Sequence, residues 1–187
     1  MLTTFPTDLE LHAEGGLVLR LPTDADVEAI AAACQDPDIA RFTRVPSPYT
    51  VDDARWFVGM AADGARSGAS LNLVVHDGDD LVASCGLPRV DQRDRSAEVG
   101  YWVAPGARGR GVATRASRAV CRWAFEEAGV ERLMLEAATV NPSARATPLD
   151  PGFTLEGTLR QAAVEGGTDH PARLDMNVHG LLPGELR

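Results

Sequence analysis

A stretch of alternating arginine and glycine, followed by small residues, carries the clearest chemical signal in the sequence. Residues 108–114 read Arg-Gly-Arg-Gly-Val-Ala-Thr and separate a predicted strand from a long predicted helix. Gly109 and Gly111 lack side chains, so backbone N–H groups there can approach a ligand closely. The helix adds unpaired N–H donors and the positive end of its dipole, an arrangement that suits a pyrophosphate. The alternative interpretation is a tight turn with solvated arginines.

Two familiar phosphate-binding loops can be excluded. A Walker A loop ends in Gly-Lys followed by Ser or Thr, and this chain has no lysine, because all 18 of its basic residues are arginine. A dinucleotide-binding fingerprint requires a small third residue at position 114, which is Thr114, and lies in the first βαβ unit of a parallel sheet. Here the loop follows an antiparallel-looking meander. The absence of lysine also excludes a catalytic lysine.

The elements around this loop are predicted from the periodicity of the apolar residues. Helices are expected to begin at Thr23, Thr50 and Gly111, and the Asp36–Pro37 pair is expected to end the first of them. A further helix after Asn141 is cut short by two prolines. The order β-α-α-β-β-β-α-β-α-β-β predicts a mixed α/β fold. Strands are expected at residues 17–21, 70–76, 81–87, 97–103, 132–138, 153–160 and 174–182.

Composition limits the class of protein. The 187 residues fit a single domain, 1–187, that needs neither disulfides nor a metal to fold. A net charge of −9 argues against general nucleic-acid binding and favours a cationic or amine partner. Cys34, Cys85 and Cys121 form no CxxC pair, so we expect buried thiols in a reducing compartment rather than a zinc site. No apolar run has membrane-spanning length and no secretory signal is evident, so we expect a cytoplasmic protein.

Five segments, in order, resemble one known family. Arg108-x-x-Gly111-x-Ala113 resembles the acyl-CoA pyrophosphate loop of the GNAT N-acetyltransferases. Residues 97–103, Ala-Glu-Val-Gly-Tyr-Trp-Val, resemble the "E-x-G-Y-W" strand of the Rim branch, which acetylates the N-termini of ribosomal proteins. Residues 19–26, the "GF-x-x-EG-x-LR" segment at 152–160 and the final strand at 175–182 resemble the same branch. The resemblance spans about residues 17–182, nearly the whole chain.

The resemblance implies a fold and a co-substrate. The fold is that of GNAT enzymes, classed as α/β or α+β, with a mixed, mostly antiparallel central sheet, a splayed strand pair and flanking helices. Pantetheine from acetyl-CoA, or another acyl-CoA, would lie against the backbone of Tyr101, Trp102 and Val103. Asn141 would bond the pantetheine arm, although Asn also suits an N-cap there. No metal is implied. The implied pyrophosphate site comprises Arg108, Gly109, Arg110, Gly111, Val112, Ala113 and Thr114.

The resemblance also implies a reaction, in which a neutral amine attacks a thioester directly and forms a tetrahedral intermediate. This chemistry needs a base, an N–H that stabilises the oxyanion and a proton for the leaving thiolate. Glu98, beside the splay, is the preferred base, and a structural ion pair is the alternative role for it. His76 and His170 are the competing bases.

The chain departs from the family pattern where the acid should be. The family has Ser at the fourth position of "N-x-x-S", whereas position 144 is Ala and the serine stands at Ser143. Ser143 or a water molecule could therefore protonate the thiolate. Three hypotheses remain: an N-acetyltransferase, a CoA-binding module of GNAT fold with little or no catalysis, and an interaction protein that has lost the cofactor. The acceptor, a small amine or a protein N-terminus, is not readable, and a homodimer rests on family likeness alone.

Overall fold

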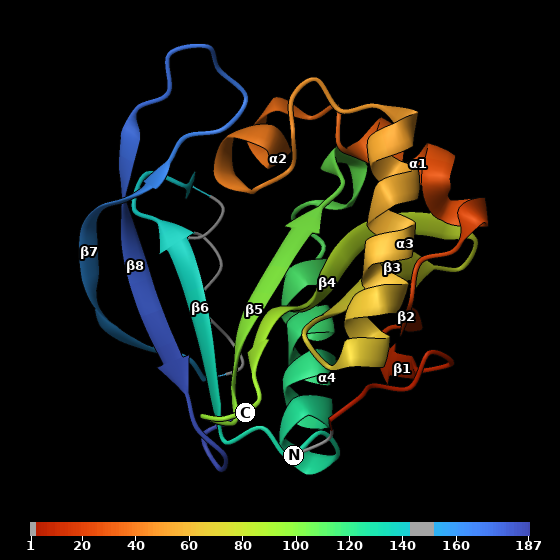
Figure 1. Cartoon of the computed structure of the whole chain (residues 1–187), viewed down its shortest axis with the longest axis vertical. Helices are drawn as coiled ribbons and strands as arrows, with labels where there is room; N and C mark the ends of the chain where they lie inside the picture. Colours follow the sequence, from red (N-terminus) through yellow and green to blue (C-terminus); the bar gives the residue numbers. More distant parts are fainter. Residues whose placement is uncertain (1–2, 143–151) are drawn as a thin grey trace.

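The computed structural model describes residues 3–142 and 152–187. Its helices are α1 (Val27–Ala33), α2 (Pro37–Phe42), α3 (Val51–Ser67) and α4 (Val112–Glu126), with short 3-10 turns at Asp24–Asp26 and Pro105–Ala107. Its strands are β1 (Glu10–Ala13), β2 (Leu17–Arg20), β3 (Leu71–Asp77), β4 (Asp80–Asp91), β5 (Ser96–Val103), β6 (Arg132–Ala138), β7 (Thr154–Val164) and β8 (Arg173–Leu181). These strands form one sheet in the order β1-β2-β3-β4-β5-β6-β8-β7 (Figure 1).

The pairing of β5 with β6 distinguishes the centre of the sheet. All the other neighbouring strands are antiparallel, whereas β5 and β6 are parallel and pair only from Ser96 opposite Arg132 to Glu98 opposite Met134. Beyond these residues β5 pairs with β4 alone and β6 with β8 alone. The two strands therefore diverge toward their carboxyl ends (Figure 1). This confirms the predicted splay, although it opens within the 97–103 strand rather than after it.

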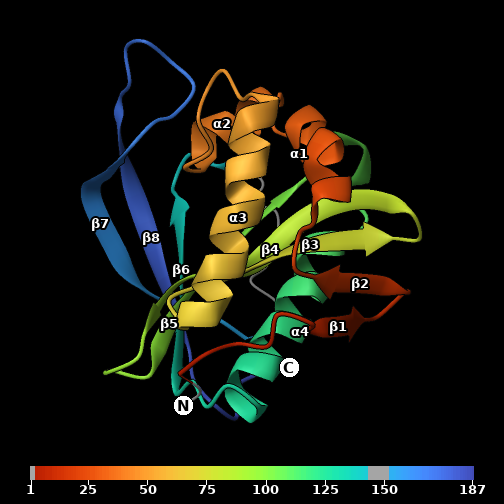
Figure 2. The same ribbon diagram turned by 45° about the vertical axis from the view of Figure 1, so that its right-hand side comes forward.

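Helices cover both faces of the sheet. Figure 2 shows α1 and α3 on one face and α4 on the other. Alternate side chains of β3 reflect the two layers, because Leu73 is buried in the core that includes Val120 of α4, whereas Val74 is buried with Ile30 of α1. Each fully buried aliphatic side chain contributes about 1.5–3 kcal/mol relative to an exposed one. Burial on both faces therefore stabilises the sheet from which the loops at its ends extend.

The predicted capping box of α3 is confirmed. The Asp53 N–H donates to Thr50 Oγ1 at 3.2 Å, and the Thr50 N–H donates to Asp53 Oδ2 at 2.7 Å. Two of the orphan donors at the helix start are satisfied in this way. The helix ends at Gly68, whose φ of +67° is a left-handed conformation that suits glycine.

The role expected for the Asp36–Pro37 pair was wrong. The first helix, α1, already ends at Ala33, and Pro37 begins the short helix α2. Proline is favoured in the first turn because its missing N–H would have no helical partner there. Asp36 is the N-cap, with its carboxylate accepting the N–H groups of Asp38 and Ile39 at 3.1 Å. Neither α2 nor the edge strand β1 was predicted from the sequence.

The three cysteines lie in the interior, as predicted. Cys34, Cys85 and Cys121 are free and buried. Burial raises the pKa of the Cys34 and Cys85 thiols to about 12. These thiols are therefore protonated at neutral pH and pack as small apolar side chains.

Candidate functional site

The predicted phosphate loop connects the end of β5 to the start of α4. Gly111 is the N-cap of α4, and the φ angles of Gly109 and Gly111 are +73° and +71°. A Cβ atom would meet nothing within 4 Å at Gly109 and only Arg115 Nε, at 4.0 Å, at Gly111. The left-handed backbone, rather than a shortage of space in the protein, therefore requires glycine at both positions.

The N-terminus of α4 presents free backbone donors. The Arg115 N–H bonds to the Gly111 carbonyl at 3.1 Å, which starts the helical ladder. The N–H groups of Val112, Ala113 and Thr114 precede it and have no acceptor within the helix. Among the residues that the structure describes, no side chain caps this end, and the helix is 15 residues long. Its dipole and three free donors form a site that fits a pyrophosphate.

Protein carboxylates already engage the arginines of this loop. The Arg108 Nη2 donates to Asp36 Oδ1 at 2.5 Å, and the Arg110 Nη2 donates to Asp77 Oδ2 at 2.6 Å. These contacts neutralise part of the positive charge of the loop. The backbone N–H groups of the loop are thus available to an anion without breaking either of these two ion pairs.

The backbone of β5 faces the opening at alternate residues. The Ala104 N–H bonds to the Val82 carbonyl of β4 at 2.9 Å. Because backbone groups alternate in direction along an antiparallel strand, those of Trp102 also point toward β4. The N–H and C=O groups of Tyr101 and Val103 point the other way, toward the splay. Of the three residues predicted to pair with pantetheine, these two have the required direction.

Glu98 lies at the apex of the splay and is held by an ion pair. It is the last residue of β5 that pairs with β6. The Arg89 Nε of β4 donates to Glu98 Oε2 at 2.6 Å, and the glutamate side chain is 19% exposed. The structure therefore places Glu98 at the apex of the splay and also gives it the ion pair that was the alternative interpretation.

The two competing histidines have other surroundings. The His76 Nε2 lies 3.0 Å from Asp26 Oδ1, and Arg20 donates to both oxygens of Asp26 at 2.7 and 2.9 Å. Burial alone would raise the pKa of Asp26, but hydrogen bonds from Arg20 and Thr23 outweigh it and lower that pKa to about 2. His76, on β3, thus belongs to a separate network, and two strands, β4 and β5, lie between β3 and β6. His170 is exposed in the connection between β7 and β8.

Asn141 and the phosphate loop lie at the same end of the sheet. The Asn141 N–H bonds to the Ala138 carbonyl at 2.9 Å, so the chain turns there at the carboxyl end of β6. The loop at 108–111 follows the carboxyl end of the parallel strand β5. Ligands of open α/β sheets bind beyond such ends. Ser143, the predicted acid, lies outside the described residues.

Glu136 is a candidate that the sequence analysis missed. It lies on β6, beyond the last residue that pairs with β5, and it is exposed. Leu133 and Leu135 are buried in the α4 core, so the alternate residues Met134 and Glu136 face the α3 side of the sheet. Glu98 is opposite Met134 and faces the same side. The period-2 pattern of 132–138 contained this signal.

His179 is a second residue without a sequence signal. It lies on β8 opposite Leu135 and is 9% exposed. Burial lowers the pKa of its imidazole, partly offset by a hydrogen bond with the Leu135 backbone. Its Nδ1 atom has no hydrogen-bond partner in the described part of the chain. It shares a face with Leu181 of the α4 core, so it lies on the opposite side of the sheet from Glu136.

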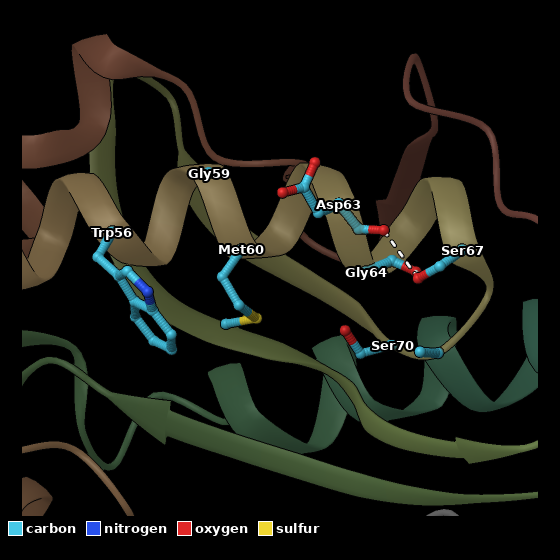
Figure 3. Close-up of a pocket in the computed structure, with 8 residues that line it drawn as sticks. Trp56, Gly59, Met60, Asp63, Gly64, Ser67 and Ser70 are labelled. Carbon is cyan, nitrogen blue, oxygen red and sulfur yellow. Dashed lines mark hydrogen bonds between the residues drawn. The ribbon is translucent and has the colours of Figure 1, made fainter.

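A groove of about 650 Å³ lies along α3. Trp56, which is 69% exposed, and Met60 point from α3 toward the neighbouring strands, and Ser70 lies near the other end of the groove (Figure 3). Ala69 also lines it and accepts the Val90 N–H at 3.0 Å, one residue from Arg89 and its ion pair with Glu98. Because α3 lies on the face of the sheet toward which Glu98 and Glu136 are directed, the groove is on that face as well.

Residues 3–142 and 152–187 contain no group of three His, Cys, Asp or Glu side chains that could hold a metal ion. No helix within those ranges is long and apolar enough to cross a membrane.

Known proteins resemble this chain in sequence. The sequence model of the acetyltransferase (GNAT) domain matches residues 16–154. YdaF of Bacillus subtilis, which is named as a ribosomal N-acetyltransferase, is 35% identical over 127 residues, covering 66% of this chain and 67% of YdaF. YoaA of the same organism, named as an N-acetyltransferase, is 26% identical over 170 residues, covering 89% of this chain and 93% of YoaA.

Solved structures share the fold. RimJ of Mycobacterium smegmatis, in complex with a CoA disulfide, gives a TM-score of 0.81 at 23% identity, covering 95% of this chain and 88% of RimJ. RimL, a ribosomal L7/L12 α-N-protein acetyltransferase in complex with CoA, gives a TM-score of 0.84 at 17% identity, covering 93% of this chain and 98% of RimL. Both superpositions extend over nearly the whole of each chain.

Proposed function

This chain belongs to the GNAT family of acetyltransferases, and from that premise we propose that it transfers an acetyl or other short acyl group from CoA to a primary amine. The observation that carries this proposal is the opening between β5 and β6, with the free N–H groups of α4 at its end. CoA carries both a pyrophosphate and an amide-containing arm, so its binding needs both the N–H groups and the opening. The CoA complexes of RimJ and RimL add support from proteins of the same fold.

Each part of the co-substrate has a matching group in the chain. The N–H groups of Val112, Ala113 and Thr114 bind the pyrophosphate, with Gly109 and Gly111 keeping the loop in shape. The backbone of Tyr101, directed into the opening, pairs with the amides of pantetheine, and Asn141 bonds the same arm from the end of β6. When bound, acetyl-CoA supplies the activated thioester. No metal takes part in this proposal.

The amine approaches from the α3 side of the sheet, where both carboxylates face. Glu98 takes the ammonium proton, directly or through water, as a general base. Glu136, which has no hydrogen bond or ion pair among the described residues, attracts the ammonium before it is deprotonated. A β5 N–H that faces the opening stabilises the oxyanion of the tetrahedral intermediate. Ser143 or water returns a proton to the thiolate.

A protein N-terminus is the acceptor class that we favour. YdaF and RimL are named for ribosomal substrates, and the groove along α3, about 650 Å³ in volume, has room for more than an isolated amine. The net charge of −9 attracts a basic polypeptide.

We place the enzyme in the cytoplasm, where its buried free thiols stay reduced. We also propose that the enzyme forms a homodimer through β7, because β7 is an edge strand and exposes the apolar side chains of Leu155 and Leu159.

One assay tests this function. Thiol release from acetyl-CoA is measured with a panel that contains peptides with free N-termini, the same peptides with blocked N-termini, and small amines. We expect turnover with free N-termini and none with blocked ones. Tight CoA binding without turnover on any amine would instead indicate a binding module, and turnover on small amines alone would overturn the acceptor class.

A further inference from the structure

Arg108 joins three parts of the molecule. Its backbone begins the loop, immediately before Gly109. Its Nε donates to the Val103 carbonyl at 3.2 Å, and its Nη2 donates to Asp36 Oδ1 at 2.5 Å. Its Nη1 lies 3.6 Å from Asp38 Oδ2. All three guanidinium nitrogens are thus directed at the end of β5 or the start of α2, so the side chain fixes the loop rather than extending freely toward a phosphate.

Asp36 holds both Arg108 and the start of α2. The same Oδ1 atom accepts Arg108 and the N–H groups of Asp38 and Ile39, and the side chain is only 12% exposed. Burial acts to raise the pKa of Asp36. The hydrogen bonds from Arg108 and from the α2 backbone act in the opposite direction and outweigh burial, so the pKa lies below its ordinary value. The carboxylate is therefore ionised at neutral pH and links the loop to α2.

The other end of α2 is tied to the connection between β7 and β8. Arg41 forms an ion pair with Glu165, and the Gly166 N–H donates to the Arg41 carbonyl at 3.1 Å. A Cβ atom on Gly166 would lie 2.1 Å from the Ala40 carbonyl oxygen, so the two backbones are in direct contact. Figure 1 shows α2 beside this connection, at the end where β5 and β6 diverge.

From these contacts we propose that α2 couples CoA binding on the loop to the β7–β8 connection, with Asp36 as a positioning residue that acts through Arg108. This inference rests on the proposed function. A pyrophosphate favours the loop shape that Arg108 maintains while it is docked on Asp36, so CoA stabilises the docked α2. By linkage, undocking α2 weakens CoA binding by the same factor. Because Ile39 of α2 packs in the cluster that contains Trp102, the docked helix borders the α3 side, where the amine approaches.

The first test separates positioning from simple charge. Asn caps a helix as well as Asp does, so Asp36→Asn keeps α2 and removes only the charge that holds Arg108. We expect the Kd for CoA, measured by calorimetry, to rise about fivefold, the lower end of ordinary coupling. Asp52→Asn, which breaks an exposed ion pair with Arg55 on α3, is the control and should leave the Kd unchanged. Unchanged or tighter CoA binding by a folded Asp36→Asn variant overturns the proposal.

The second test follows the far end of α2. In the wild-type protein CoA should slow hydrogen exchange at the Gly166 N–H by about fivefold. Glu165→Gln should bind CoA but lose this slowing, because the tie to Arg41 is broken. A wild-type protein that binds CoA without any slowing at Gly166 overturns the coupling alone. A wild-type protein that does not bind CoA overturns the proposed function, and the coupling with it.

Discussion

Arg89 and Glu98 face each other across β4 and β5, and the arginine Nε donates to Glu98 Oε2 at 2.6 Å. This pair lies at the last residue of β5 that still pairs with β6. The arginine is 59% exposed, so the pair itself is worth only about 0.2–1 kcal/mol. A carboxylate held at the apex of the opening by a weak, solvent-facing contact can leave that contact to accept a proton.

The replacement Glu98→Gln keeps the shape of the side chain and removes its ability to accept a proton. Turnover should fall by about 10²- to 10⁴-fold, the usual contribution of a positioned base. The KM for acetyl-CoA should change little, because the base acts mainly in the transition state. The loss should shrink at high pH, where more of the amine is already neutral. Steady-state kinetics across pH measure all three effects.

Arg89→Met is the matched control for that variant. It breaks the same ion pair but leaves the carboxylate in place, so it should lower the melting temperature slightly and keep the turnover. Equal turnover in Arg89→Met, Glu98→Gln and the wild-type protein would assign Glu98 a purely structural role and direct attention to His76, His170 or a bound water.

Glu136→Gln removes the negative charge from the part of β6 that no longer pairs with β5. We expect the KM for the amine to rise by about fivefold, or about 1 kcal/mol, as for an exposed ion pair. The Kd for CoA and the melting temperature should not change, because the residue is exposed and its side chain makes no hydrogen bond or ion pair in the described structure. Glu127→Gln, an exposed carboxylate just past α4, should leave every parameter unaltered. An unchanged KM for the amine in Glu136→Gln would contradict this role.

Asp26 makes the stability of the fold depend on pH. Its pKa is about 2 in the folded protein and about 3.9 in an unfolded chain. Because the folded pKa is the lower one, the carboxylate stabilises the fold above about pH 4 and loses this effect as the pH falls toward 2. Asp26→Asn should cost about 3 kcal/mol at pH 7, because it leaves the Arg20 guanidinium without an anionic partner.

Urea unfolding at pH 7 and at pH 2 measures this dependence. The difference between the wild-type protein and Asp26→Asn should be large at pH 7 and small at pH 2. Asp24→Asn, an exposed neighbour, should match the wild-type protein at both pH values. A difference that stays constant between pH 7 and pH 2 would exclude the Asp26 carboxylate as its source.

The sequence predicted the central elements of the site because their signals are local. The alternation of residues 97–103 and the helical period from Gly111 gave β5 and α4, and the Thr50 capping box gave the start of α3. The helix α2 was missed because its six residues provide little more than one turn of periodicity, and Asp36–Pro37 was taken as an end rather than a beginning. Apart from its local Asp36 cap, this short helix depends on tertiary contacts.

The contacts of the loop arginines could not be predicted from the sequence. Arg108 lies 72 residues from Asp36, and Arg110 lies 33 residues from Asp77. No local sequence pattern distinguishes an arginine that is available to bind phosphate from one that already forms an ion pair with a carboxylate. The sequence predicted glycine at Gly109 and Gly111 because a ligand must approach their N–H groups closely, and the left-handed backbone of both residues adds a second requirement that only the structure shows.

The central claim is that the loop before α4 binds the pyrophosphate of CoA, and titration of CoA into the Gly111→Val variant tests it most directly. Gly184→Val is the control, because Gly184 also has a positive φ, +92°, and no atom within 4 Å of an added Cβ. Both variants carry similar backbone strain, but only the first places a side chain beside the free N–H groups. We predict that the Kd for CoA rises at least about tenfold, or about 1.4 kcal/mol, in Gly111→Val and stays unchanged in Gly184→Val. An unchanged Kd in a folded Gly111→Val variant would contradict the account.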